Sequence, residues 1–519
     1  MNGVWRSLLW KEWREQRSSI AILTAFFVLI PTLFSLRTPT NYFGVYSMTL
    51  FVIPIMCLFV AMGIAAREQA SGTIGFLQAL PISPRKPASA KLFWGIISVT
   101  APLLFSLGVA WLVRASLGSA AQEAIEWDAS NYGIAGQAWF QVRAIVPPVA
   151  AVSLLLWFSA AGVNGSDEVR AGAIGLLVVV LFWGMFGLVA FVLDLLKVYS
   201  VERVVDVGMA MAPGGIVTFD LGMPSVGRAE RTSSWNWFLA AMMIFSHAAL
   251  TAIYVGRFGR LAPGRRQTVE SATVRELPTW LAPPRRSPFA AIAWKQFRES
   301  APLAAMGAMC ITVITAIVYL AMKREAAGEM TVGQLFFAAV AIWMTVGLMV
   351  SVVAGVGVFL EDLSPGLNYF WRSRPINTTK WFVVKYSVGL LVTTVTLAVP
   401  MLAIAFYAWV APDEVSSLNM RSNEEIRTTA VIGGLGQIVV YNCAIAAIVL
   451  LRRPIHAAFT AIVAALVGLM VSGTLAHSMP LSRIGVEVEA VMALFVVFLG
   501  LMAAALAWFA VKRDWGWSR

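Results

Sequence analysis

Long apolar runs without a charged residue alternate along this chain with short charged segments. A helix needs about 20 mostly apolar residues to cross the roughly 30 Å hydrocarbon core of a bilayer. Twelve runs are close to this length or longer. They lie at 20–36, 44–66, 92–113, 144–163, 171–193, 236–255, 301–322, 334–360, 386–410, 430–451, 455–476 and 490–511. The pattern predicts an all-α polytopic membrane protein with twelve transmembrane helices.

The composition excludes a water-soluble fold. Of the 519 residues 59% are hydrophobic and 13% charged, against about 25% charged in soluble domains. The net charge of +12 is spread over many short loops, which argues against nucleic-acid binding. Cys57, Cys310 and Cys443 each lie alone in an apolar run, so we expect buried core residues and neither a disulfide framework nor a metal or redox site.

The distribution of charge predicts the orientation in the membrane. With an even number of spans, both termini lie on the same side. If that side is cytoplasmic, the inside segments hold 27 Lys and Arg against 11 Asp and Glu, and the outside segments hold 12 against 16. An excess of basic residues inside is the usual bias of membrane proteins. We therefore expect a multi-pass protein of the cell membrane with both termini in the cytoplasm.

The chain contains an internal repeat. Residues 10–16 match 294–300 at an offset of 284, and residues 68–91 match 362–385 without a gap at an offset of 294. Each half then has a Trp- and Arg-rich segment, predicted as a helix in the headgroup layer, followed by six spans. In the first half Glu12 interrupts the apolar face of that helix. Six spans per half predict parallel repeats related by a pseudo-twofold axis along the membrane normal.

The repeat gives three parts. Residues 1–256 form the first half and 289–519 the second, and between them 257–288 read as a cytoplasmic linker rich in arginine and proline. In each half the loop after the second span is too long for a simple turn. Gly72 and Pro81 bound a short amphipathic helix, and Ser83 is placed to cap the next helix. Such a helix either docks into a partner or packs under its own bundle.

The spans offer no evident chemistry of their own. None contains Asp, Glu, Lys or Arg, although ion-coupled carriers usually keep such groups at membrane depth. No nucleophile with a base and no Gly-x-x-x-x-Gly-Lys-Ser/Thr phosphate loop occurs, and no soluble stretch could hold a nucleotide-binding domain. We expect no enzyme activity and no cofactor in this chain, so energy for transport would enter through its cytoplasmic surface.

Residues 68–86 and Lys91 resemble one stretch of the type-2 permeases of ATP-binding-cassette transporters: an acid, small residues, Gly-Thr, an apolar run, Leu-Pro, a hydroxyl and basic residues. The preceding Trp-rich helix resembles their connecting helix, and Met211-Ala212-Pro213 their re-entrant region. The resemblance implies that separate ATPase subunits dock on residues of both halves. These are Trp10, Lys11, Arg14, Glu15, Glu68, Gly72, Phe76, Leu77, Pro81, Lys86 and Lys91, then Trp294, Lys295, Arg298, Glu299, Asp362, Gly366, Phe370, Pro375, Lys380 and Lys385.

The resemblance further implies an exporter driven by two copies of a cytoplasmic ATPase, which would bind ATP and Mg, with fused halves in place of a dimer. The second loop departs from the pattern, because Leu367 and Arg374 replace Thr73 and Leu80. Two other classes stay open: an ion-coupled twelve-span carrier and a membrane assembly factor without transport activity. The sequence does not identify the transported substrate.

Overall fold

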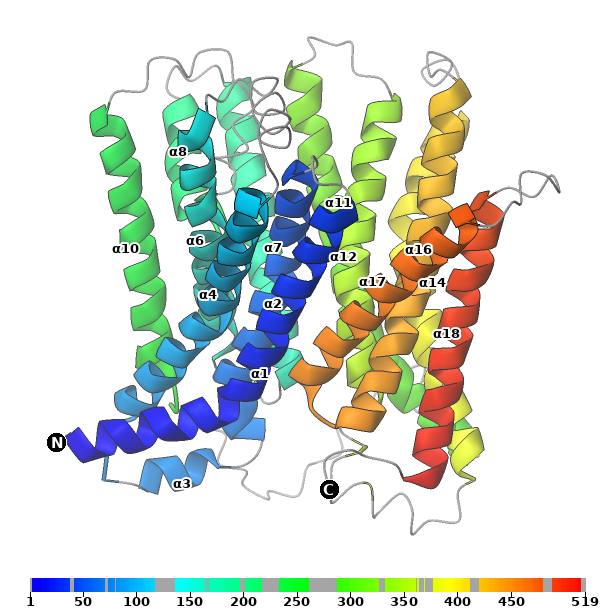
Figure 1. The fold of residues 1–519 in the computed structure, drawn as a ribbon, viewed down its shortest axis with the longest axis horizontal. Helices are drawn as coiled ribbons and strands as arrows, with labels where there is room; N and C mark the ends of the chain where they lie inside the picture. The colour runs from blue at the N-terminus through cyan, green and yellow to red at the C-terminus, as the bar shows by residue number, and fades with distance from the viewer. Residues whose placement is uncertain are drawn as a thin grey trace. The chain divides into compact units, whose positions relative to one another are not determined.

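The chain is all-helical in its described part (Figure 1). The computed structural model describes residues 2–37, 42–70, 73–79, 81–116, 136–163, 165, 168–196, 201–216, 233–260, 287–325, 332–360, 362–363, 368, 377–410, 420–478 and 488–514. The chain divides into two compact units, Met1–Leu261 and Ala262–Arg519. Much of the predicted linker, 257–288, lies outside the described residues.

Unit 1 consists of long helices and two short ones. Its elements are α1 (Asn2–Arg37), α2 (Tyr42–Ala70), α3 (Ile74–Ala79), α4 (Arg85–Ser116), α6 (Gly136–Gly162), α7 (Glu168–Leu195), α8 (Val201–Met211) and α10 (Ser233–Arg257). The described part of unit 2 contributes six long helices. They are α11 (Pro288–Glu325), α12 (Val332–Leu360), α14 (Thr378–Val410), α16 (Met420–Leu451), α17 (Pro454–Ser478) and α18 (Val488–Arg513).

Ten helices of the described part are long and apolar enough to cross a membrane, which makes this a multi-pass membrane protein. Eleven of the twelve predicted runs lie within a helix, and the run 144–163 extends one residue beyond the end of α6. The two runs that are not among the ten are 20–36 in α1 and 455–476 in α17. Helix α17 contributes a shorter apolar stretch, His456–Gly468.

Helix α1 joins the predicted headgroup helix and the first predicted span into one helix of 36 residues, about 54 Å long at 1.5 Å per residue. We predicted two elements, and the structure has one because no Gly or Pro interrupts residues 13–30. Figure 1 shows the N-terminal part of α1 running crosswise to the long helices of unit 1 before the chain turns along them. Helix α11 joins the corresponding segments of unit 2 in the same way.

The loop after α2 contains the predicted short helix, α3, between Gly72 and Pro81. Helix α4 begins only at Arg85, because Pro87 has no N–H to donate to the Ser83 carbonyl. That carbonyl instead accepts a hydrogen bond from Lys86 N at 3.0 Å. In unit 2, Asn377 takes the position of Ser83, and its side-chain oxygen accepts from the N–H groups of Thr379 and Lys380 at 3.0 and 3.2 Å.

A short non-helical turn follows α8 inside unit 1. Residues 212 and 213 are buried and Gly214 has φ of +70°. The Ser153 hydroxyl donates to Ala212 O and accepts from Gly214 N, at 3.3 and 3.1 Å, and the Ser246 hydroxyl donates to Met211 O at 3.2 Å. Buried backbone that leaves helical structure needs such partners. Ala212 and Pro213 of the Met211-Ala212-Pro213 segment singled out in the sequence lie in this turn, and Met211 is the last residue of α8.

The core of each unit is apolar and closely packed. Cys57, Cys310 and Cys443 are all buried, as predicted. Gly433 allows close helix packing, because a Cβ there would lie 2.7 Å from Met344 Cγ of the neighbouring α12.

Candidate functional site

Charged side chains gather where α1, α2 and α4 meet at one end of unit 1. We call this set, Lys11, Glu12, Glu15, Glu68 and Lys91, the unit 1 charge cluster. Glu12, Glu68 and Lys91 are between 2% and 7% exposed. Burial of ionised groups is costly unless they are paired and hydrogen-bonded. The cluster is therefore built to satisfy its own charges.

Each lysine of the unit 1 charge cluster contacts carboxylates from two helices. Lys91 Nζ of α4 lies 3.2 Å from a Glu12 carboxylate oxygen of α1 and 2.9 Å from Glu68 Oε1 of α2. Lys11 Nζ lies 2.7 Å from Glu68 Oε1, 3.3 Å from Glu12 Oε1 and 3.4 Å from Glu15 Oε1. These contacts fasten three helices together at one point.

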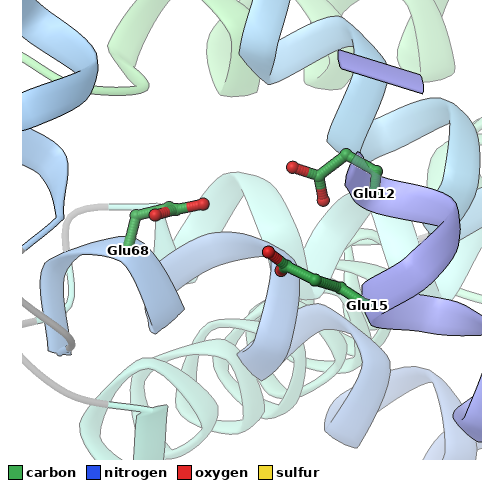
Figure 2. Close-up of side chains that lie close together, drawn as sticks. All are labelled: Glu12, Glu15 and Glu68. Carbon is green, nitrogen blue, oxygen red and sulfur yellow. The ribbon is translucent and has the colours of Figure 1, made fainter. Parts of the chain in front are cut away.

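The carboxylates of Glu12, Glu15 and Glu68 point toward one another (Figure 2). Their nearest oxygens lie within 4.8 Å of one another, which is a spacing that a divalent cation could bridge. Lys11 Nζ is within 3.4 Å of all three, so an ammonium group already lies where such an ion would bind. The arrangement favours a fixed ionic joint over a metal centre.

The cluster raises the pKa of Lys11, and it is also connected to the loop between α2 and α4. Burial by itself lowers the pKa of Lys11, but the charges of Glu12, Glu68 and Glu15 and the bond to Glu68 raise it above its ordinary value. The Thr73 hydroxyl, one residue before α3, donates to the carbonyl and to the carboxylate of Glu68. The short helix is thus tied directly to the cluster.

Tyr254 of α10 closes the same end of unit 1. It is fully buried, and its hydroxyl donates to Ile64 O of α2 at 2.9 Å. The last long helix of the unit is thereby joined to the helix that carries Glu68. Four helices of unit 1 are connected around this region by polar contacts.

Unit 2 has a smaller cluster at the matching positions. Lys295 Nζ lies 3.0 Å from Asp362 Oδ1 and 3.4 Å from Glu299 Oε1, and Lys385 pairs with the other oxygen of Asp362. We call Lys295, Glu299, Asp362 and Lys385 the unit 2 charge cluster. Burial alone would raise the pKa of Asp362, but the charges of both lysines and their hydrogen bonds hold it below its ordinary value.

The two clusters differ at two positions: Asp362 replaces Glu68, which keeps the charge, and Gln296 replaces Glu12, which removes a charge. Gln296 is buried, its amide nitrogen donates to Ser300 Oγ at 2.7 Å, and its Oε1 accepts no hydrogen bond from the described residues. The ammonium group of Lys385 therefore contacts one carboxylate fewer than that of Lys91. Its ammonium instead lies 5.5 and 5.8 Å from the ring centres of Phe359 and Trp381, which are cation–π distances.

The positions in unit 1 that match Phe359 and Trp381 at the offset of 294 are Ala65 and Pro87. Neither offers an aromatic face. The buried lysine is thus stabilised by two carboxylates in unit 1, and by one carboxylate with two aromatic rings in unit 2.

Unit 2 has a further polar contact outside its charge cluster. Asn368, in the loop after α12, donates to Asp514 Oδ1 at 3.3 Å, and Arg452 pairs with the same oxygen at 2.7 Å. Arg452 and Asp514 have φ of 52° and 54°, a conformation that costs about 1 kcal/mol or more for a non-glycine residue. At the offset of 294, the position in unit 1 that matches Asn368 is Ile74, whose side chain cannot donate a hydrogen bond.

The predicted site residues fall into three groups. Glu68, Lys91, Asp362 and Lys385 are buried, and Lys11, Glu15 and Lys295 are partly buried in the clusters. Others lie outside the clusters: Trp10, Arg14, Pro81, Arg298 and Lys380 are exposed, Leu77, Lys86 and Trp294 are half-buried, and Glu299 is an exposed member of its cluster. Gly72, Gly366, Phe370, Pro375 and the side chain of Phe76 lie outside the described part.

Sequence reasoning missed Glu12, Phe359 and Trp381. The signal for Glu12 was present, because a carboxylate on the apolar face of a helix is unfavourable without a buried cation. We treated it as a flaw in the amphipathic pattern. Nothing in the sequence marks Phe359 and Trp381 as partners of Lys385, since aromatic residues are common throughout the spans.

A comparison with models of protein families and one with curated proteins found no match to this sequence.

Proposed function

We propose that this chain is the membrane-spanning permease subunit of an ATP-binding-cassette exporter. Its twelve spans would form two parallel six-helix repeats in the cell membrane, with both termini in the cytoplasm. Two copies of a separate ATPase would bind ATP and Mg and dock on the connecting segments and first loops. The resemblance of residues 68–91 to type-2 permeases is the origin of this proposal.

The observation that carries the proposal is the recurrence of one ionic joint. In each unit a lysine of the first helix and a lysine near the start of α4 or α14 share an acid, which is Glu68 in the last turn of α2 and Asp362 just after α12. These are the segments that the repeat aligns. An ionic contact of this kind beside the first loop of each half is expected of a protein in which a partner transmits force to both loops.

The joint gives a physical route for that force. Thr73 links the loop to Glu68, and Glu68 is paired with lysines of α1 and α4. Because the charges are buried, separating them exposes unpaired ions at a cost of several kcal/mol. A push on α3 would therefore move α1, α2 and α4 together, and would pass into the spans.

Asp substitutions in the first loop test the docking. We expect Leu77→Asp, and Phe76→Asp beside it, to lower ATPase retention and ATP-driven transport at least tenfold while the chain stays folded. Ser287→Asp is the matched control, because Asp is a favourable residue at the start of α11 and should leave both unchanged. The measurements are co-purification with the partner ATPase and export from proteoliposomes.

Phe370→Asp and Trp371→Asp test the second loop in the same assays. Retention of the ATPase with full transport in the Leu77→Asp variant would contradict the docking assignment. Solute flux in vesicles driven by a cation gradient alone, without ATPase or ATP, would contradict the whole proposal and favour an ion-coupled carrier. Purified complexes that never contain a nucleotide-binding protein would favour an assembly factor.

A further inference from the structure

The N-terminal part of α1 has two opposite faces of different chemistry. At 100° per residue, one exposed row falls within about 80° of arc. Its members are Arg6, Trp10, Arg14 and Arg17, and we call them the arginine face. The opposite row is buried against unit 1 and consists of Leu8, Glu12, Gln16, Ser19 and Leu23.

The arginine face carries three positive charges that the described part of unit 1 does not neutralise. None of its arginines has an ion pair with a described residue. The acids of the same helix are engaged elsewhere: Glu12 is buried with Lys91, and Glu15 pairs with Lys11 and Arg67. Trp10 is 60% exposed in the middle of the face. The face therefore complements an anionic partner.

The position of the face along α1 indicates which anion it meets. Arg17 is the last charged residue before the uncharged run that begins at Ile20, about 4.5 Å further along the helix. An arginine so close to the start of a span lies at the level of the lipid headgroups. Tryptophan is enriched at that level as well. Arg14 lies about one turn before Arg17.

The corresponding helix of unit 2 lacks this feature. At the offset of 284 the four positions carry Ala290, Trp294, Arg298 and Ala301. One arginine is left, and Glu299 is exposed beside it. The corresponding face of α11 therefore carries one positive charge where α1 carries three, so the arginine face is not a general consequence of the repeat.

We propose that the arginine face of α1 binds the headgroups of anionic phospholipids. The interaction goes beyond the proposed transport function and concerns unit 1 alone. Guanidinium groups bind phosphate through paired hydrogen bonds, and each basic residue near an anionic surface adds about fivefold to binding. Trp10 and Arg14, which the sequence assigned to ATPase contact, then face lipid.

Native mass spectrometry of the purified full-length chain tests the proposal. The chain is offered equal amounts of phosphatidylglycerol and phosphatidylcholine with the same acyl chains. We expect preferential retention of phosphatidylglycerol, and a loss of at least tenfold in that preference when Arg6→Gln, Arg14→Gln and Arg17→Gln are combined. Combining Arg260→Gln, Arg265→Gln and Arg266→Gln removes equal charge from the predicted linker and should change it less than twofold.

Three outcomes would overturn the proposal. The first is an unchanged lipid preference in the variant of the arginine face, provided its melting temperature equals that of the wild type. The second is an equal loss of the preference for phosphatidylglycerol in the linker variant. The third is loss of a co-purifying ATPase from the face variant in nanodiscs of phosphatidylcholine alone, which would make the face a protein contact. A combined Arg→Lys variant keeps the charge and should keep most of the preference.

The result is separable from the proposed function. If no ATPase binds the wild-type chain, the transport proposal fails, whereas a preference for phosphatidylglycerol that depends on the arginine face still stands. If the ATPase binds and the preference is absent, only the lipid proposal fails.

Discussion

A buried lysine at the start of a long helix needs compensation, and this chain provides it in two ways. Lys91 contacts Glu12 and Glu68, whereas Lys385 contacts Asp362 and lies near the rings of Phe359 and Trp381. A cation–π contact that is shielded from water contributes up to about 2 kcal/mol. Two aromatic faces are thus comparable to the hydrogen bond of one lost carboxylate.

Glu12→Gln tests this account at the residue scale. The variant gives unit 1 the amide that unit 2 carries at Gln296, but without aromatic rings beside the lysine. We expect the free energy of unfolding to fall by about 1–3 kcal/mol, since a charged hydrogen bond to a buried ammonium is lost. The measurement is the unfolding midpoint of the purified protein in detergent.

Glu15→Gln is the matched control for Glu12→Gln. Its side chain is 26% exposed and bonds to the half-exposed Lys11, so the expected loss is below about 1 kcal/mol. Equal losses in the two variants would contradict the claim that burial of the pair decides its contribution.

Asp362 predicts a dependence of stability on pH. Its pKa in the folded chain lies below the ordinary 3.8, so the ion pairs contribute stability above pH 3.8, and this contribution is lost as the pH falls through the folded pKa. Asp362→Asn should lower the melting temperature at pH 7, and the difference from the wild type should narrow below pH 3.8. If the two proteins keep the same difference in melting temperature down to pH 2, the ion pairing of Asp362 is contradicted.

At the scale of elements, two aligned residues make different hydrogen bonds: Ser83 before α4 and Asn377 before α14. Ser83 is followed by Pro87, which cannot donate a backbone hydrogen bond, and the Ser83 carbonyl bonds to Lys86 N. Asn377 has no such proline after it, and its side chain accepts two backbone N–H bonds at the start of α14. This is the geometry of a helix N-cap.

Asn377→Ala tests the cap. We expect a loss of about 1 kcal/mol, because two N–H groups lose their acceptor. Ser83→Ala should cost less, since the Ser83 contact shown in the structure is made by the carbonyl, which alanine keeps. Thermal unfolding of both variants in one detergent provides the comparison. A larger loss of stability in Ser83→Ala than in Asn377→Ala would contradict the conclusion that Ser83 contacts α4 through its carbonyl.

At the scale of the whole molecule, the three native cysteines make the orientation testable. All are buried, so a membrane-impermeant maleimide should label the wild type weakly in intact cells. We expect Ser130→Cys, in a predicted outside segment, to be labelled at once. Ser271→Cys, in the predicted linker, should be labelled only after the membrane is opened. The reverse pattern would place the termini outside.

The sequence by itself determined the class of the molecule, because apolar runs that cross a bilayer must be helical whatever surrounds them. It also located the repeated segments and most members of both charge clusters, through residues matched at fixed offsets. It did not reveal that Glu68 pairs with both Lys11 and Lys91, since these lysines lie 57 and 23 positions away along the chain and on other helices.

Only the tertiary structure decided the partners. It placed Glu12 against Lys91 and left Arg14 exposed on the same helix, and it gave Lys385 its aromatic neighbours. The physical reason is that hydropathy is a property of each residue, whereas the cost of burying a charge depends on which groups from other helices reach it.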